Sequence, residues 1–297
     1  MNKIFGIDIG GTKCVIAQIQ EDGVILKRER IATHSSEQGE YILDRIIEVI
    51  RAMDVPVQNT LGIGVGSAGQ ISRDGRVLSA TDTFQNWQGL NIQEYLENKL
   101  ALPVKVINDV QAMALGEMTF GAAKGAKDMI CLALGTGVGG GIINEGQLYR
   151  GHLGAAGEFG HFILIPDGLP CPCGSRGCVE AYLSGKALER AYAKKANTEL
   201  SGTEIFSLSE LGDVTAQKVV KEYLHYLIVT IKSLTAIFNP EMLVIGGGVS
   251  QSLVGFSTKL TTEVREEVMA VNKGIEVKIS ELESDAMVLG AASQFMK

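Results

Sequence analysis

Two stretches of this 297-residue sequence repeat one pattern, in which an apolar strand runs into a glycine-rich turn with a threonine and a second strand follows. The first copy is GIDIGGTKCVIAQI, from Gly6, and the second is LALGTGVGGGIINE, from Leu132. A repeated hairpin predicts two duplicated lobes that face each other. A chain of this length also exceeds what one hydrophobic core usually holds. We therefore expect an α/β protein with lobes at residues 1–118 and 119–297 and a central cleft. The last helix (285–297) belongs by sequence to the second lobe but could pack back on the first.

The charge and hydropathy of the chain argue against several classes of protein. The formal net charge is −7 and the sequence pI is about 5.3, whereas a nucleic-acid-binding protein needs a basic footprint. No apolar run reaches the length that spans a bilayer, so we expect no membrane partner. No export leader precedes the first strand, so we expect a cytoplasmic protein in a reducing compartment.

Hydrophobic periodicity and turn residues predict the order of the elements. Strands are expected at residues 3–9, 14–20, 24–32, 61–67, 103–108, 128–134, 141–149, 242–245 and 274–280. Helices are expected at residues 40–53, 91–100, 109–120, 179–195, 214–238, 252–272 and 285–295. The first three strands should form an antiparallel meander, and residues 69–80 a small hairpin around Asp74 and Gly75.

One segment of the second lobe carries the side chains of a metal site. Its four candidate ligands lie within eighteen residues: His161, Cys171, Cys173 and Cys178. One imidazole and three thiolates make a complete tetrahedral set for zinc and leave no position for a reactive water. The alternative is a disulfide or unrelated buried thiols, but two cysteines one residue apart are poorly placed to bridge each other. We expect a structural zinc that folds the loop so that Glu158 and Glu180, at its two ends, point into a ligand cleft.

Three glycine-rich turns, at residues 10–13, 135–141 and 246–248, follow apolar strands. Such turns expose backbone N–H groups and let phosphate oxygens approach the chain closely. The alternative for each one is a tight hairpin, which needs glycine anyway. The second turn also satisfies the dinucleotide pattern Gly-x-Gly-x-x-Gly from Gly135 to Gly140. That pattern requires a helix to follow, and here a strand is expected, which argues against a Rossmann site.

Three segments together resemble the ROK family of sugar kinases, repressors and open reading frames: GIDIGGTK at 6–13, AGEFGH at 156–161 and CPCGSRGCVE at 171–180. The resemblance covers essentially the whole chain. It implies the actin-like ATPase (ribonuclease H-like) fold, with ATP and a sugar in the cleft between two α/β lobes and a zinc-stapled loop. It also implies an ATP-dependent sugar kinase with ATP, Mg²⁺ and structural Zn²⁺, which acts on a small-molecule sugar and forms a homodimer.

The resemblance assigns roles to single residues. The positions that match the ATP and magnesium site are Asp8, Gly10, Gly11, Thr12, Lys13, Gly135, Thr136, Gly137, Gly246, Gly247 and Gly248. Those that match the sugar site are Gly66, Asn108, Asp109, Glu158, His161 and Glu180, with His161 also a zinc ligand and Asp109 the general base. From the residues alone, Asp109 at a strand-to-helix junction is either a catalytic carboxylate or an ordinary N-cap.

Two departures from the family pattern leave the sugar open. Residues 66–72 lack the proline and aspartate that many members carry after the third core strand. Glucokinase-like members often carry Asn-x-x-Gly-Trp, whereas here Thr83 and Asn86 stand at the positions of that asparagine and glycine before Trp87. N-acetylmannosamine, another hexose and a β-glucoside therefore stay as alternatives to glucose. A repressor and a catalytically silent sugar sensor are two other candidate functions. For a repressor, we expect no room before the first strand for a DNA-binding domain.

Overall fold

The computed structural model describes residues 2–53, 59–80 and 84–296. Within them the chain forms two five-stranded mixed sheets and a small two-stranded hairpin. Thr83, in the segment that bears on the sugar, lies outside the described residues. In the same described part, no helix combines the length and the apolar character that crossing a membrane requires.

The first sheet has the strand order β3-β2-β1-β4-β7. Its strands are β1 (Lys3–Ile9), β2 (Lys13–Gln20), β3 (Ile25–Ala32), β4 (Thr60–Ser67) and β7 (Val104–Asn108). The first three strands pair antiparallel, as predicted, and β4 and β7 run parallel to β1. Strands β1 and β2 are apolar and almost wholly buried, whereas β3 carries Lys27, Arg28 and Arg30 because it lies at the edge of the sheet.

The second sheet repeats this arrangement strand for strand, in the order β10-β9-β8-β11-β12. Its strands are β8 (Met129–Leu134), β9 (Val138–Asn144), β10 (Gln147–Leu148), β11 (Met242–Gly246) and β12 (Glu276–Ile279). Strand β9 pairs antiparallel with β8 and β10, and β11 pairs parallel with β8 and β12. Strands β1 and β2 of the first sheet thus correspond to β8 and β9 of the second, which confirms the duplication that the sequence indicates.

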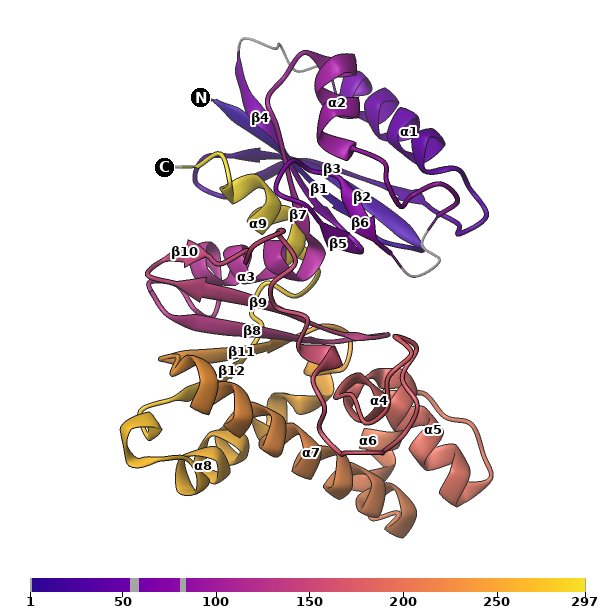
Figure 1. Cartoon of the computed structure of the whole chain (residues 1–297), viewed down its shortest axis with the longest axis vertical. Helices are drawn as coiled ribbons and strands as arrows, with labels where there is room; N and C mark the ends of the chain where they lie inside the picture. Colours follow the sequence, from indigo (N-terminus) through magenta and orange to yellow (C-terminus); the bar gives the residue numbers. More distant parts are fainter. Residues whose placement is uncertain (1, 54–58, 81–83, 297) are drawn as a thin grey trace.

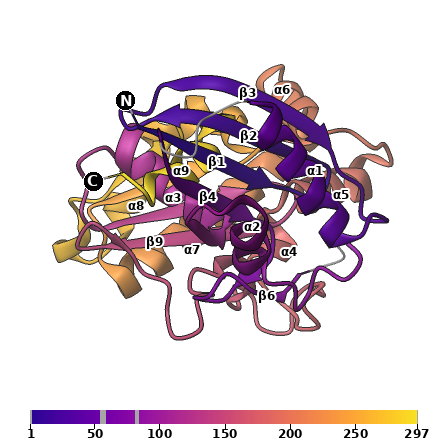
Figure 2. The same ribbon diagram turned by 90° about the horizontal axis from the view of Figure 1, so that it is seen from above.

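Two helices, α3 (Asp109–Phe120) and α9 (Ala286–Ser293), form a layer between the two sheets (Figure 1). In the view from above, both lie behind strands of the first sheet (Figure 2). A Cβ atom on Gly64 of β4 would lie 1.8 Å from the carbonyl oxygen of Ala291, and one on Gly290 would lie 1.7 Å from that of Ala112. Glycine at both positions therefore allows α9 to pack directly on the first sheet and on α3. The C-terminal helix completes the first lobe although it comes last in the chain.

Other helices cover the outer faces of both sheets (Figure 1). The first sheet is covered by α1 (Gly39–Ala52) and α2 (Ile92–Leu100), whose buried isoleucines and leucines share its core. The second sheet packs against α4 (Glu180–Leu183), α5 (Gly185–Ala196), α6 (Gly202–Glu210), α7 (Val214–Phe238) and α8 (Ser257–Glu267). The predicted hairpin is present as β5 (Gln70–Ile71) and β6 (Val77–Ser79).

Two of the predicted helices are wrong in extent. The helix expected at 179–195 is broken at Ser184, whose extended backbone separates α4 from α5 and whose side chain caps α5 by accepting from the backbone N–H of Ala187 at 3.1 Å. The helix expected at 252–272 is a 3₁₀ segment (Ser250–Phe256), then α8, then a 3₁₀ turn (Ala270–Asn272). Gly255, inside the first 3₁₀ segment, lowers the helix propensity there.

The second glycine-rich turn is shorter than predicted, because β9 already starts at Val138. Glycines 139–141 lie in the strand, where Cβ atoms would collide with α3 and with Phe159; the closest approach is 2.1 Å, at Gly140. The strand expected at 141–149 is likewise interrupted by a turn at Glu145 and Gly146, both with positive φ. Helix α6 was not predicted, although Ser201 and Glu204 form a capping box, which is a sequence signal for a helix start.

Candidate functional site

The first glycine-rich turn joins β1 to β2. The backbone N–H of Gly10 donates to the carbonyl of Lys13 at 3.0 Å, and the Thr33 hydroxyl donates to the carbonyl of Gly10 at 2.9 Å. These bonds fix the shape of the turn, while Gly11, Thr12 and Lys13 stay exposed. The turn can therefore offer its backbone and a lysine charge to an anionic ligand.

The second and third glycine-rich turns lie side by side at the carboxyl ends of β8 and β11. The backbone N–H of Gly135 donates to the carbonyl of Gly137 at 2.9 Å, which closes the second turn and leaves Thr136 exposed. Gly247 has φ +83°, and a Cβ there would lie 2.5 Å from the carbonyl oxygen of Leu134, the last residue of β8. Gly246 is buried against Met113 of α3, whereas Gly248 has open space beside it.

Asn108 and Asp109 lie where β7 ends and α3 begins. The helix is capped by Asn108, whose side-chain oxygen accepts from the N–H groups of Val110 at 2.9 Å and Gln111 at 3.2 Å. Asp109 is therefore the first helical residue and not the N-cap, which corrects that alternative. Its Oδ1 accepts from the N–H of Val110 at 2.9 Å. A Cβ on Gly66 would lie 3.1 Å from the Cβ of Ala112, so glycine eases the close approach of β4 to the first turn of this helix.

Four acidic residues from different parts of the sequence come close enough for their charges to interact. Burial, together with the charge of Asp109, raises the pKa of Asp8 to about 7, against the opposing effect of Lys13. Burial also raises the pKa of Asp109 to about 6, with a smaller contribution from Glu158. Burial raises the pKa of Glu158, and Glu180 adds to that shift. Such a cluster favours binding of a cation or of hydroxyl donors.

The loop between β10 and α4 brings the four predicted zinc ligands together. The ligand atoms of His161, Cys171, Cys173 and Cys178 all lie within 4.8 Å of one another. The Cys173 and Cys178 sulfur atoms are 3.7 Å apart, as are the Cys171 sulfur and His161 Nδ1. A tetrahedral zinc site with metal–sulfur bonds of about 2.3 Å has sulfur–sulfur edges of about 3.8 Å, so these residues fit the ion.

His161 links the metal cluster to the acidic cluster. Its Nδ1 faces Cys171, while its Nε2 lies 4.0 Å from an Oε atom of Glu158. An imidazole with one nitrogen on a metal commonly presents the other to a carboxylate, and this fixes the orientation of both groups. At the far end of the loop, an Oε of Glu180 accepts from the backbone N–H of Val138 at 2.9 Å. The metal loop is thus tied to the second glycine-rich turn.

Three polar residues around this site were missed by the sequence analysis. The Gln70 side chain hydrogen-bonds to Glu158. Gln111 and Arg150 hold the loop that leads to Glu158. The available signal for Gln111 was a polar residue inside the apolar helix 110–116.

Trp87 follows the residues that differ from the glucokinase-like pattern. It is buried beneath the β4–β5 corner, and its Nε1 lies 3.4 Å from the carbonyl of Ala68.

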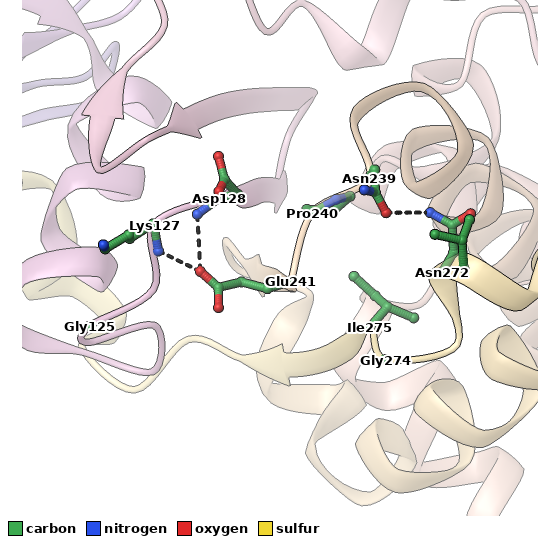
Figure 3. A pocket seen from close by; sticks show the side chains of 10 residues that line it. Gly125, Lys127, Asp128, Asn239, Pro240, Glu241, Asn272, Gly274 and Ile275 are labelled. Atoms are coloured by element: carbon green, nitrogen blue, oxygen red, sulfur yellow. Dashed lines mark hydrogen bonds between the residues drawn. The ribbon is translucent and has the colours of Figure 1, made fainter.

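A separate cavity of about 550 Å³ lies at the amino ends of the strands of the second sheet (Figure 3). Its lining includes Asp128, Glu241 and Ile275, which immediately precede β8, β11 and β12. Ligands of open α/β sheets bind at the carboxyl ends of the strands, where the glycine-rich turns lie. The Glu241 carboxylate in this cavity accepts from the backbone N–H of Asp128 at 3.1 Å, so it already has a structural role.

Comparison with known proteins agrees with this arrangement. The model of the ROK family matches residues 4–297. The chain belongs to the ROK family. The family that the sequence motifs indicate is therefore confirmed.

Several relatives of this ROK protein are kinases by name. It is 35% identical to the glucokinase of Streptomyces coelicolor over 84% of this chain and 83% of that protein. It is 33% identical to the N-acetylmannosamine kinase of Shigella boydii over 96% of each chain. The crystal structure of a ROK glucokinase from Streptomyces griseus, in complex with glucose and AMPPNP, superposes with a TM-score of 0.84 at 32% identity and covers 99% of both chains. The predicted actin-like ATPase fold is thereby confirmed.

Proposed function

We propose that this ROK protein is an ATP-dependent sugar kinase, which transfers the γ-phosphoryl group to the glucose-type 6-hydroxyl of a hexose or hexose derivative. The observation that carries this proposal is the position of Asp109, at the start of the helix between the two sheets and close enough to Asp8 and Glu158 for their charges to interact. The glucokinase names of several relatives support the same class of reaction.

In the proposed reaction, Asp109 accepts the proton of the sugar hydroxyl while the hydroxyl oxygen forms a bond to the γ-phosphorus and the bond to ADP breaks. A pKa of about 6 suits this role, because the carboxylate is ionised at neutral pH and still basic enough to take a proton. The hydrogen bond from Val110 to one carboxylate oxygen fixes the orientation of the base.

The proposed nucleotide site consists of the three glycine-rich turns. The phosphates would contact the backbone and side chains of Gly10, Gly11, Thr12, Lys13, Gly135, Thr136 and Gly137, and the adenosine side would contact Gly246, Gly247 and Gly248. Asp8 would lie near the magnesium ion, which neutralises phosphate charge when bound. Burial of Asp8 beside Asp109 favours such a cation, because each carboxylate raises the energy of ionising the other.

The proposed sugar site consists of Gly66, Asn108, Asp109, Glu158, His161 and Glu180. Carboxylates can accept hydrogen bonds from sugar hydroxyls, and an imidazole with one nitrogen on a metal can donate through the N–H of the other. A zinc ion on His161, Cys171, Cys173 and Cys178 would supply loop rigidity and no reactive water. His161 then keeps one nitrogen for Glu158 and the sugar.

N-acetylmannosamine kinase is the second candidate. It is favoured by the similarity to the Shigella boydii enzyme and by the lack of the glucokinase-type residues before Trp87. A β-glucoside is a third possible acceptor. A coupled ADP-release assay with ATP and Mg²⁺ against glucose, other hexoses, N-acetylmannosamine and β-glucosides separates them. The expected result is sugar-dependent ADP release, and its absence across the panel contradicts the kinase proposal and favours a silent sensor.

Two structural proposals accompany this function. The first is that lobes 1–118 and 119–297 move as units when the sugar binds, with α9 counted with the first lobe because it packs on β1 and β4. The second is a homodimer, which the resemblance to the family implies. Small-angle scattering with and without sugar tests the first proposal, and sedimentation velocity tests the second.

A further inference from the structure

We propose that Gln111 is a positioning residue for sugar binding: it holds the loop before Glu158 in a fixed relation to Asp109. This inference rests on the proposed function, since it concerns the sugar side of that site. Gln111 is the third residue of α3, two positions after Asp109, and its exposed fraction is 1%.

The contacts of Gln111 connect two parts of the site. Its Nε2 donates to the carbonyl of Gly154 at 3.0 Å and to that of Ala156 at 3.1 Å. Ala156 is two residues before Glu158, just as Gln111 is two residues after Asp109. One carboxamide therefore joins the backbone beside the proposed base to the backbone beside a proposed sugar contact.

The chemistry of the carboxamide is specific at this position. Two carbonyl oxygens face the same nitrogen, so the side chain must supply two N–H donors, and a carboxylate or an apolar group cannot. Its Oε1 is buried and has no partner among the described residues. A buried polar atom without a partner lowers the stability of the fold. Here the two hydrogen bonds that Nε2 of the same amide donates offset that loss.

The loop itself has few side chains to hold it. Gly154 and Gly157 have φ values of +106° and +101°, and a Cβ at either would lie 2.4 Å from a carbonyl oxygen of Ile71 or of Gly140. The loop therefore lies directly on the backbone of other segments, and Ala156 packs against the hydrophobic cluster of the second lobe. The far end of the loop is held separately by Arg150, which donates to the carbonyls of Ser72 at 2.9 Å and Val106 at 3.2 Å. Gln111 is the anchor nearer to Glu158.

Loss of this anchor should weaken sugar binding and leave nucleotide binding unchanged. The glycine-rich turns of the proposed nucleotide site make none of the hydrogen bonds of Gln111. Gln111→Met keeps the size of the side chain and removes both donors. We expect it to raise the KM for sugar about 10- to 100-fold, the effect of weakening one or two hydrogen bonds to the sugar, with KM for ATP within about twofold.

Gln18→Met is the matched control. Gln18 is a buried glutamine of β2 in the same lobe and outside the proposed site, and its Nε2 has no partner among the described residues. Gln18→Met therefore makes the same change of side chain in the same lobe without breaking a hydrogen bond of Nε2, and the rise in KM for sugar should be confined to Gln111→Met. Equal sugar KM values in the two variants would overturn the proposal, and so would a parallel rise in the KM for ATP.

A second variant covers the case in which Gln111→Met does not fold. Gln111→Asn keeps both donors on a side chain shorter by one methylene, and its sugar KM should fall between those of wild type and the methionine variant. Sugar binding is also measured directly by calorimetry. If wild type binds a sugar without phosphorylating it, the kinase proposal fails while the positioning proposal is still tested by weaker sugar binding in Gln111→Asn; unchanged binding there overturns it.

Discussion

The carboxylate of Glu180 accepts a hydrogen bond at 2.9 Å from the backbone N–H of Val138, the residue that follows the second glycine-rich turn. Glu180 comes directly after the metal loop and also contributes to the raised pKa of Glu158. One side chain therefore contacts the end of the proposed phosphate turn and interacts through its charge with Glu158 of the proposed sugar site.

The hydrogen bond of Glu180 to Val138 and its charge interaction with Glu158 predict the effects of two substitutions. Glu180→Ala removes both interactions and should raise the KM values for ATP and for sugar, each about tenfold. Glu180→Gln keeps an oxygen that can accept from Val138, so its KM for ATP should stay near the wild-type value while the KM for sugar rises. Steady-state kinetics with each substrate varied in turn checks this. Equal KM values for ATP in all three proteins would mean that the bond to Val138 has no part in nucleotide binding.

Asp109→Asn should keep the fold and sugar binding but lower kcat by roughly 10²–10⁴, the usual contribution of a general base. The asparagine oxygen can still accept from the N–H of Val110, so the start of α3 is preserved. Rapid-quench measurement of one turnover, with sugar affinity measured by calorimetry as the control, checks the effect. Turnover within a few-fold of wild type would remove Asp109 from this role.

The pKa of Asp109 sets the expected pH profile. The base must be deprotonated, and burial raises its pKa to about 6, so kcat/KM for the sugar should rise with pH and level off above pH 7. Buffers at constant ionic strength are needed, since neighbouring acids add to the shift. A profile that is flat between pH 5 and 7 would contradict the assignment of the base.

Asp8→Asn should stabilise the magnesium-free protein while it abolishes activity. A folded pKa of about 7, above the ordinary 3.8, means that the ionised carboxylate destabilises the fold. The cost is absent below pH 3.8 and grows to an upper limit of about 4 kcal/mol as the pH rises through 7. The Tm of the variant should therefore exceed that of wild type more at pH 8 than at pH 5.5. A lower Tm at pH 8 would show that the site stabilises the charge of Asp8.

Cys173→Ala should lose zinc and sugar phosphorylation together. Three ligands remain, but the exposed Cys173 is one corner of the set, and the loop that carries His161 depends on it. Elemental analysis and the ADP-release assay on the same preparation check both losses. Cys14→Ala is the control, because that buried cysteine lies outside the cluster. Full activity in zinc-free protein would show that the metal does not shape the sugar site.

Much of the fold and of the site follows from local sequence. The hairpins around residues 10–13 and 135–137 are predicted because glycine and threonine interrupt apolar strands, and the zinc ligands because their spacing suits one ion. Features that depend on distant contacts were not predictable. The break at Ser184 and the placing of glycines 139–141 inside a strand depend on packing against other elements. Gln111 stands out locally only as a polar residue in an apolar helix, and its role could not be predicted because its partners are more than 40 residues away.

Gly6 and Gly64 leave the face of the first sheet open for a helix that is synthesised last, with the carbonyl of Val288 directly above Gly6. While the ribosome is still translating residues 121–285, α3 can already pack on β4 and β7, but the part of that face over β1 has no α9 to cover it, and the amino-terminal lobe cannot complete its core. Domains that are synthesised first usually fold first, but this lobe can fold completely only after α9 has been translated. A stop codon before residue 286 would therefore damage the part of the protein that was made first.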